Sequence, residues 1–171
     1  MIEKIYKGMG SVSEWVAKVA IWLLAILIVS IVYDVVMRYL FNAPTTWSFV
    51  LSYMLGAAFS ALGQARGDFT GSNVRVDMFY TRFSARGKQI IDLVFTIIFF
   101  FPLYGFLAYY FAQLTQEAIR THQTALESTW YPIIWPYMIV VTFGLGLLFV
   151  QGIATFLKNL MSLVKGGKEP W

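Results

Sequence analysis

Long apolar stretches alternate with short polar segments along this chain of 171 residues. A helix that crosses the hydrocarbon core of a membrane needs about 20 mostly apolar residues. Four stretches meet this requirement, at residues 15–40, 47–65, 89–112 and 133–157. Backbone polar groups in lipid must be paired within the segment, and the runs are too continuous for barrel strands. The pattern therefore predicts an all-α integral membrane protein with four transmembrane helices in a single domain, residues 1–171.

Composition agrees with this prediction. The chain is 58% hydrophobic and only 13% charged, whereas a soluble domain carries about 25% charged residues. The formal net charge is +4, which in a membrane protein is typical of loops that set topology and does not indicate nucleic-acid binding. The absence of cysteine excludes disulfides, thiolate zinc sites and cysteine nucleophiles.

The basic residues predict an orientation. Of the 13 Lys and Arg residues, all but Arg38 and Arg120 lie in the N-terminal region, the second connection or the C-terminal region. Four spans place these three regions on one side of the membrane. The positive-inside rule then predicts that both termini and the second connection lie in the cytoplasm.

Two of the predicted helices have features that bear on packing. Small residues recur at helical spacing in the second helix, and such residues let helix backbones approach closely in lipid. They indicate packing within the chain, with a dimerisation face as the alternative: Ser52, Gly56, Ser60 and Gly63. In the third helix, Pro102 predicts a kink. A broken helix can also line a transported substrate, and this alternative stays open.

The ionisable residues near the predicted outer surface suggest structure more than chemistry. Asp34 precedes Arg38 by four residues, the favourable order for an ion pair on a helix. A proton relay is the alternative interpretation. His122 is the only histidine and lies in a predicted outer loop with Glu117 and Glu127. A metal site needs several converging ligands, so we expect no metal, no cofactor and no catalytic site.

The second connection is basic and aromatic. Placed on a helix, its arginines form a stripe beside its phenylalanines: Arg75, Phe79, Arg82, Phe83 and Arg86. This pattern predicts a short amphipathic helix at the inner surface, with its arginines near anionic lipid phosphates. A plain cytoplasmic hairpin is the alternative.

Three groups of residues resemble one known family. The first is VMRYLFNAP at 36–44 followed by Thr46-Trp47-Ser48, which includes Arg38, Asn42, Pro44 and Trp47. The second is LGQAR at 62–66 followed by Val74-Arg75-Val76-Asp77, and the third contains Pro132 and Pro136 before the last helix. Their order and spacing resemble the small membrane subunit, DctQ-type or Q subunit, of tripartite ATP-independent periplasmic (TRAP) transporters.

The resemblance implies a system of three parts in the bacterial inner membrane. A periplasmic solute-binding protein captures an organic anion, and a large membrane subunit, DctM-type, moves it inward with sodium. The small subunit is a non-catalytic scaffold for the large one. Its outer loops would then meet the binding protein, through Glu117, Arg120, His122 and Glu127. The chain departs from the family pattern at Phe49 and Val50, where glutamates are common, and at Asn73, where histidine is usual.

Two other functions compete with this interpretation. A self-sufficient small exporter would carry an essential carboxylate near the middle of a helix, and the interiors of the predicted spans contain none. A membrane anchor of a redox complex would need histidines within its spans to bind haem, and the single histidine lies in a predicted loop.

Overall fold

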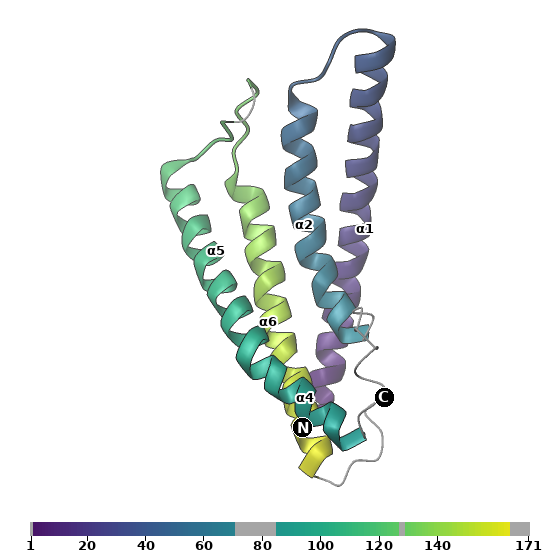
Figure 1. The fold of residues 1–171 in the computed structure, drawn as a ribbon. Helices are drawn as coiled ribbons and strands as arrows, with labels where there is room; N and C mark the ends of the chain where they lie inside the picture. Colours follow the sequence, from purple (N-terminus) through teal and green to yellow (C-terminus); the bar gives the residue numbers. More distant parts are fainter. Residues whose placement is uncertain (1, 71–84, 127–128, 165–171) are drawn as a thin grey trace.

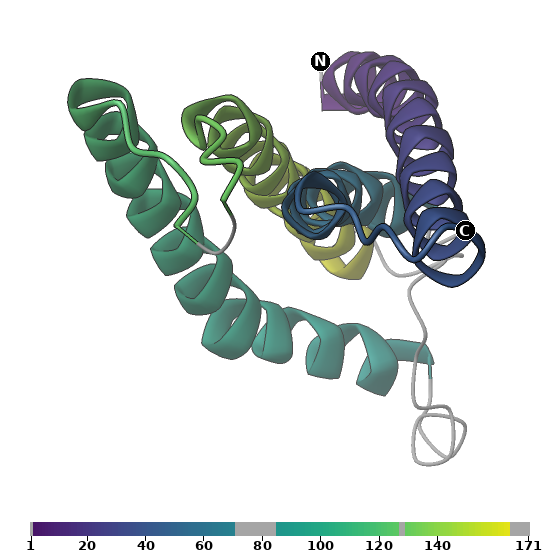
Figure 2. The same cartoon turned by 90° about the horizontal axis from the view of Figure 1, so that it is seen from above.

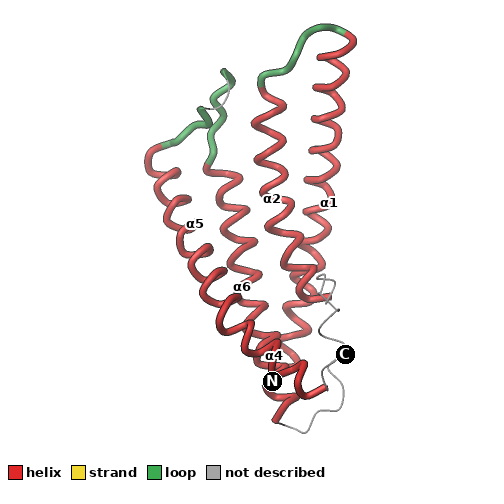
Figure 3. The backbone as a smooth tube through the Cα atoms, viewed as in Figure 1, coloured by secondary structure: helices red, strands yellow, loops and turns green. Residues whose placement is uncertain are grey.

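The computed structural model describes residues 2–70, 85–126 and 129–164. This part of the chain is almost entirely helical (Figures 1 and 3). Its long helices are α1 (Ile2–Leu40), α2 (Trp47–Thr70), α4 (Ala85–Phe95), α5 (Phe101–Thr121) and α6 (Trp135–Val164). The described residues contain no strand, only an isolated antiparallel bridge between Thr124 and Ile133.

The helices form an open row instead of a closed bundle. Seen from above, they lie side by side in the order α1, α2, α6, α5 (Figure 2). Extensive contacts join α1 to α2, α2 to α6 and α6 to α5, whereas α1 and α6 meet only briefly. The turn between α1 and α2 and the loop between α5 and α6 lie at the same end of the row (Figure 1), which we call the turn end.

Three small apolar clusters hold the row together. One joins Val16 and Ala20 of α1 to Leu62 of α2. A second joins Val50 and Met54 of α2 to Ala125 in the loop before α6. The third packs Ala61 of α2 with Val141 and Leu145 of α6, and side chains of α5 lie against it. Because each helix has few neighbours, large apolar side chains remain exposed along α1, α4 and α5.

The packing of α2 on α6 depends on a glycine. A β-carbon at Gly144 of α6 would come 2.8 Å from the carbonyl carbon of Ala61 in α2. The small residues predicted to pack are not at this contact. A β-carbon at Gly56 or at Gly63 would meet no atom within 4 Å, and Ser60 is exposed. Ala61, which lies on the opposite side of α2, makes the contact with α6, and packing by the stripe of Ser52, Gly56, Ser60 and Gly63 stays a prediction.

The third predicted helix is bent, as its proline indicated. A π-helical turn, Thr96–Phe100, separates α4 from α5, and Pro102 lies in the first turn of α5. Figure 2 shows the change of direction between the two helices. The hydroxyl of Thr96 donates to the carbonyl of Asp92 at 2.7 Å. A π-helical turn, a proline, and a threonine hydroxyl that donates to a carbonyl of its own helix are all recognised causes of helix bending.

The helices extend further than the apolar stretches alone indicated. Among the described residues, three candidate spans are long and apolar enough to cross a membrane: Glu14–Leu40, Gly87–Thr121 and Trp135–Met161. α2 is not among them, because it is the helix richest in serine and glycine. The third helix continues to Thr121, so Glu117 and Arg120 lie on α5 and not in a loop as expected.

Several predicted positions fall outside the described residues. They are Arg75, Asp77, Phe79, Arg82 and Phe83 of the second connection, and Glu127 of the loop before α6. Arg86 belongs to the first turn of α4.

Candidate functional site

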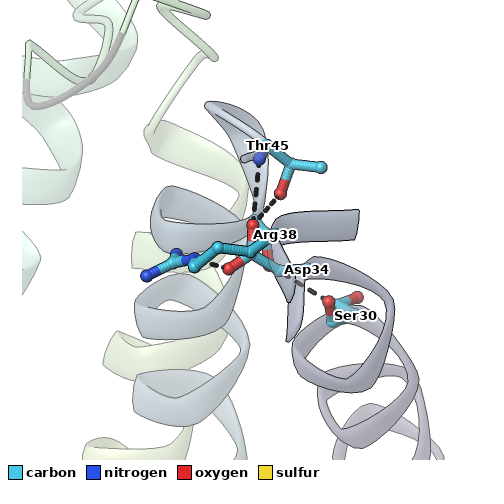
Figure 4. Close-up of polar contacts among 5 residues, drawn as sticks. Ser30, Asp34, Arg38 and Thr45 are labelled. Carbon is cyan, nitrogen blue, oxygen red and sulfur yellow. Dashed lines mark hydrogen bonds and ion pairs between the residues drawn. The ribbon is translucent and has the colours of Figure 1, made fainter. Parts of the chain in front are cut away.

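The turn between α1 and α2 is built around Asp34. The Thr45 backbone amide donates to one carboxylate oxygen at 3.0 Å, and the Thr45 hydroxyl donates to the same oxygen. Arg38 donates from Nη2 to the other oxygen at 2.5 Å. Figure 4 shows both residues converging on the carboxylate. The side chain of Asp34 is only 12% exposed, against 56% for Arg38. Thr45 is half-buried, so it is the more enclosed of the two partners.

Further contacts join α1 to α2 beyond the Asp34 carboxylate. The Ser48 hydroxyl donates to the Ser30 carbonyl at 3.1 Å, and both serines are buried. The rings of Tyr33 and Trp47 lie 5.6 Å apart, centre to centre. These contacts join the end of α1 to the start of α2 and fix the register of the two helices.

The motif positions around this turn have structural explanations. Asn42 has a φ of 54°, a left-handed conformation that asparagine tolerates better than most residues. Just beyond it, the Ala43 amide donates back to the Met37 carbonyl at 3.0 Å. Pro44 precedes Thr45 in the turn, and Trp47 begins α2. Arg38, Asn42, Pro44 and Trp47 thus gather at one place.

The last turns of α5 carry a polar hollow. It encloses about 630 Å³ and is lined by Gln113, Gln116, Glu117, Arg120 and Thr121. All five residues are exposed. Gln113 also donates to the Tyr109 hydroxyl at 2.7 Å. The side chains differ sharply from the exposed apolar ones earlier on the helix, such as Phe106. The exposed side chains of α5 therefore change from apolar to polar near Gln113.

His122 ends α5 and redirects the chain. It has a φ of 49°, and its amide donates to the Ala118 carbonyl. The Gln123 amide donates to the same carbonyl at 3.2 Å. This pair of bonds is a common helix ending that needs a left-handed residue at this position. The lone histidine therefore has a structural role at the end of α5.

The loop after His122 folds back on itself before α6. The Ala125 amide donates to the Pro132 carbonyl at 2.9 Å. Tyr131 has a φ of 46°, an unusual conformation for a bulky residue. Pro136 occupies the first turn of α6, where its missing amide hydrogen costs nothing. The two motif prolines thus shape this loop and the start of α6.

The described residues contain no group of three or more His, Cys, Asp or Glu side chains placed to hold a metal ion. Asp34, Arg38, Glu117 and Arg120 lie in the last two turns of their helices. The arrangement can lock turns and present a polar surface at the turn end.

Sequence reasoning found Asp34 and Arg38 but missed Thr45. Thr45 follows Asp34 by eleven positions in the sequence, and no local spacing rule connects them. The glutamines and Thr121 of the hollow were also missed. Their spacing at 113, 116, 117, 120 and 121 is helical, and this signal could have extended α5 past residue 112.

Comparison with known proteins gives one clear result. The family model described as "Tripartite ATP-independent periplasmic transporters, DctQ component" matches residues 27–161. The match begins within α1, ends within α6 and includes both the turn at Asp34 and the hollow of α5. A comparison with curated proteins found no match.

Proposed function

This chain belongs to the DctQ component family of the tripartite ATP-independent periplasmic transporters, and from this premise we propose that it is the scaffold of its transporter. As a family member it is the small membrane subunit. In the proposal, the large membrane subunit carries the substrate and sodium sites and imports an organic anion. The chain itself performs no chemistry and supports the large subunit.

The observation that carries this proposal is the open row of helices. A single row of helices leaves both of its broad faces uncovered, whereas a closed bundle buries the side chains that point into its interior. In the most apolar part of the Gly87–Thr121 span, no residue is buried. In the most apolar part of the Glu14–Leu40 span, 17% of the residues are buried. A large partner subunit would cover part of this surface. The open row also supports the scaffold over a self-sufficient exporter, which would need an enclosed pathway.

We further propose that all four helical segments cross the inner membrane, with both termini in the cytoplasm. α2 is flanked by α1 and α6, so it has less contact with lipid and tolerates more serine and glycine. The turn end then faces the periplasm. This orientation agrees with the distribution of basic residues, since Arg38 and Arg120 are the only two of the 13 Lys and Arg residues that the four-span arrangement places at that end.

The turn end also suits the docking of a periplasmic binding protein. The proposed contacts include Glu117 and Arg120, which are exposed on the last turns of α5. His122 lies beside them, and Glu127 lies outside the described residues. The polar hollow supports this proposal because it presents both charges and amides to solvent.

For the second connection, we propose the surface helix expected from its sequence, bound to anionic lipids through Arg75, Arg82 and Arg86.

Co-purification tests the scaffold proposal. The chain carries an affinity tag and is expressed from its native chromosomal locus, and the retained proteins are quantified. We expect a much larger multi-span protein in a one-to-one ratio. Transport in liposomes should require both proteins together with a sodium gradient. If the chain purifies alone and transports a substrate by itself, the proposal is wrong.

A further inference from the structure

The loop between α5 and α6 contains a small antiparallel hairpin. We call the segment 123–134, apart from residues 127 and 128, the loop hairpin. Backbone bonds join its two sides: the Ala125 amide donates to the Pro132 carbonyl at 2.9 Å, and the Ile134 amide donates to the Gln123 carbonyl at 3.1 Å. These four backbone groups are paired within the hairpin, which matters wherever water is scarce.

One face of the loop hairpin packs on α2. Ala125 is 3% exposed and belongs to a cluster with Val50, and Ile134 packs against the same cluster. Side chains of extended backbone alternate between two faces. The sequence neighbours Leu126 and Ile133 accordingly point away from α2 and are 80% and 51% exposed. The hairpin is thus attached on one side and uncovered on the other.

The uncovered surface is apolar and aromatic. Besides Leu126 and Ile133, it includes Trp130 and Tyr131, which are 47% and 55% exposed. The described residues of the loop hairpin carry no charge, in contrast to the polar hollow on α5. Tryptophan and tyrosine are enriched where a membrane meets water, because each ring is apolar and carries one polar group.

The contacts of α2 show the level at which the hairpin lies. Val50, which packs on the hairpin, follows Ser48 by two positions, and the Ser48 hydroxyl donates to the Ser30 carbonyl of α1. Ser30 lies inside the candidate span Glu14–Leu40, in its second half. Beside it, Val29 is 68% exposed. From this level the loop extends toward the end of the row where the α1–α2 turn lies (Figure 1). The hairpin therefore lies where the apolar part of α1 approaches its end.

We propose that the loop hairpin is an interfacial anchor whose partner is the bilayer itself. Leu126 and Ile133 lie against lipid chains, and the rings of Trp130 and Tyr131 lie among the headgroups at the turn end. The absence of charge from the described part of the hairpin and its level beside apolar α1 favour lipid over a protein partner. The hairpin directly precedes the candidate span Trp135–Met161, so it holds the start of α6 at the membrane surface.

This anchor requires only that the long apolar helices cross a membrane. Both leaflets have a headgroup layer, so the anchor does not depend on which compartment the turn end faces. It also does not depend on the scaffold role, because every residue of the anchor belongs to this chain. Failure of the anchor would therefore leave the proposed function untouched.

Spin-label accessibility tests the proposal. The chain contains no cysteine, so Leu126→Cys and Ile133→Cys each give one labelling site. The full-length chain in phospholipid nanodiscs is exposed to oxygen, which concentrates in lipid, and to a nickel chelate, which stays in water. Phe106→Cys, exposed on the apolar part of α5, is the lipid reference, and a lipid labelled on its headgroup is the surface reference.

We expect the labels at residues 126 and 133 to meet more oxygen and less nickel chelate than the headgroup reference does. A label at Trp130→Cys should resemble that reference. Nickel accessibility above the headgroup reference at residues 126 and 133 would mean that the hairpin stands in water, and it overturns the proposal. Shielding of both labels from both reagents would mean that protein covers the hairpin, and it also refutes the anchor.

A second measurement uses the complete transporter and separates lipid from a soluble partner. The labelled chain is reconstituted with the large subunit, and accessibility is measured before and after the solute-binding protein is added. The anchor predicts no change at Leu126→Cys or Ile133→Cys. If the added protein shields these labels from oxygen, the surface belongs to protein docking and the anchor is wrong.

Discussion

Gly144 of α6 lies directly against the backbone of Ala61 in α2. A β-carbon at residue 144 would come 2.8 Å from the Ala61 carbonyl carbon and 2.9 Å from its oxygen. This contact joins the α1–α2 pair to the α5–α6 pair. Backbone atoms cannot move aside as the end of a side chain can, so the separation of α2 and α6 depends on the absence of a side chain at Gly144.

Gly144→Ala should therefore destabilise the protein. Overpacking of this kind costs about 1–3 kcal/mol, and the thermal unfolding temperature in detergent should fall. Gly56→Ala is the matched control, because its new methyl group would meet no atom within 4 Å. That control should be neutral or stabilising, since alanine favours helix by up to about 1 kcal/mol over glycine. Equal effects of the two substitutions would show that the close contact is unimportant.

Phe100 and Gly152 form a second close contact, at the bend between α4 and α5. A β-carbon at Gly152 would come 2.1 Å from the Phe100 ring, so Gly152→Ala must displace that ring. We expect a loss of stability that is smaller when Phe100→Leu is also present, because adjacent residues are not additive. Gly146→Ala is the control on the same helix, with open space at its methyl group. Strictly additive effects of Gly152→Ala and Phe100→Leu would contradict the contact.

At the α1–α2 turn, Thr45 should matter more than Arg38. Thr45→Val removes a hydroxyl that donates to the enclosed Asp34 carboxylate. Arg38→Gln removes a guanidinium whose side chain is 56% exposed, and ion pairs at exposed positions contribute little. We expect Thr45→Val to lower the unfolding temperature by a few degrees and Arg38→Gln to change it less. The opposite ranking would mean that the ion pair holds the turn.

His122 allows its structural role to be separated from a docking role. Its left-handed conformation suits glycine, so His122→Gly should preserve the unfolding temperature. His122→Val should cost about 1–2 kcal/mol. If the imidazole also contacts the binding protein, His122→Gly will reduce binding-protein-dependent transport while the fold stays intact. Normal transport by this variant would remove His122 from the proposed docking surface.

Charge reversal tests the docking surface on α5. Glu117→Lys combined with Arg120→Glu should lower binding-protein-dependent transport several-fold and leave assembly with the large subunit unchanged. The effect should shrink at high salt, because exposed charges are screened. The double variant leaves the net charge unchanged, and Lys158→Glu, at the other end of the row, is the control for a charge reversal outside the docking surface. Undiminished transport by the double variant would exclude Glu117 and Arg120 from docking.

The sequence predicted the type of fold better than its packing. Long apolar runs identify helices whatever their neighbours are, and Pro102 marks a bend because it cannot complete the local hydrogen bonding. The resemblance to the DctQ family is confirmed by the match over residues 27–161. The contact between α2 and α6, which Ala61 and Gly144 make, was not predicted from the sequence. Gly56 and Ala61 are both small, and composition does not say which side of a helix meets a neighbour.

The turn at Asp34 shows the same limit. Four-residue spacing suggested Arg38 as a partner, since both residues belong to one helix. Thr45 reaches Asp34 only because the chain reverses at Asn42, and that reversal depends on tertiary contacts such as the one between Ser30 and Ser48. The C-terminal end of α5 was predicted at residue 112, whereas the helix continues to Thr121. The polar residues after 112 suggested a loop, although a helix that leaves a membrane can continue into water.

The length of the candidate spans has a consequence for how the protein sits in its bilayer. Glu14–Leu40 contains 27 residues, or about 40 Å of helix, whereas the hydrocarbon core is about 30 Å thick. A helix of that length is accommodated when it is inclined by about 40° to the membrane normal. The bend at Thr96–Phe100 lets α4 and α5 divide their 35-residue span between two inclinations. Slanted helices of this kind cover a wider area of membrane than upright ones, which gives a small subunit a broad footprint beside a larger partner.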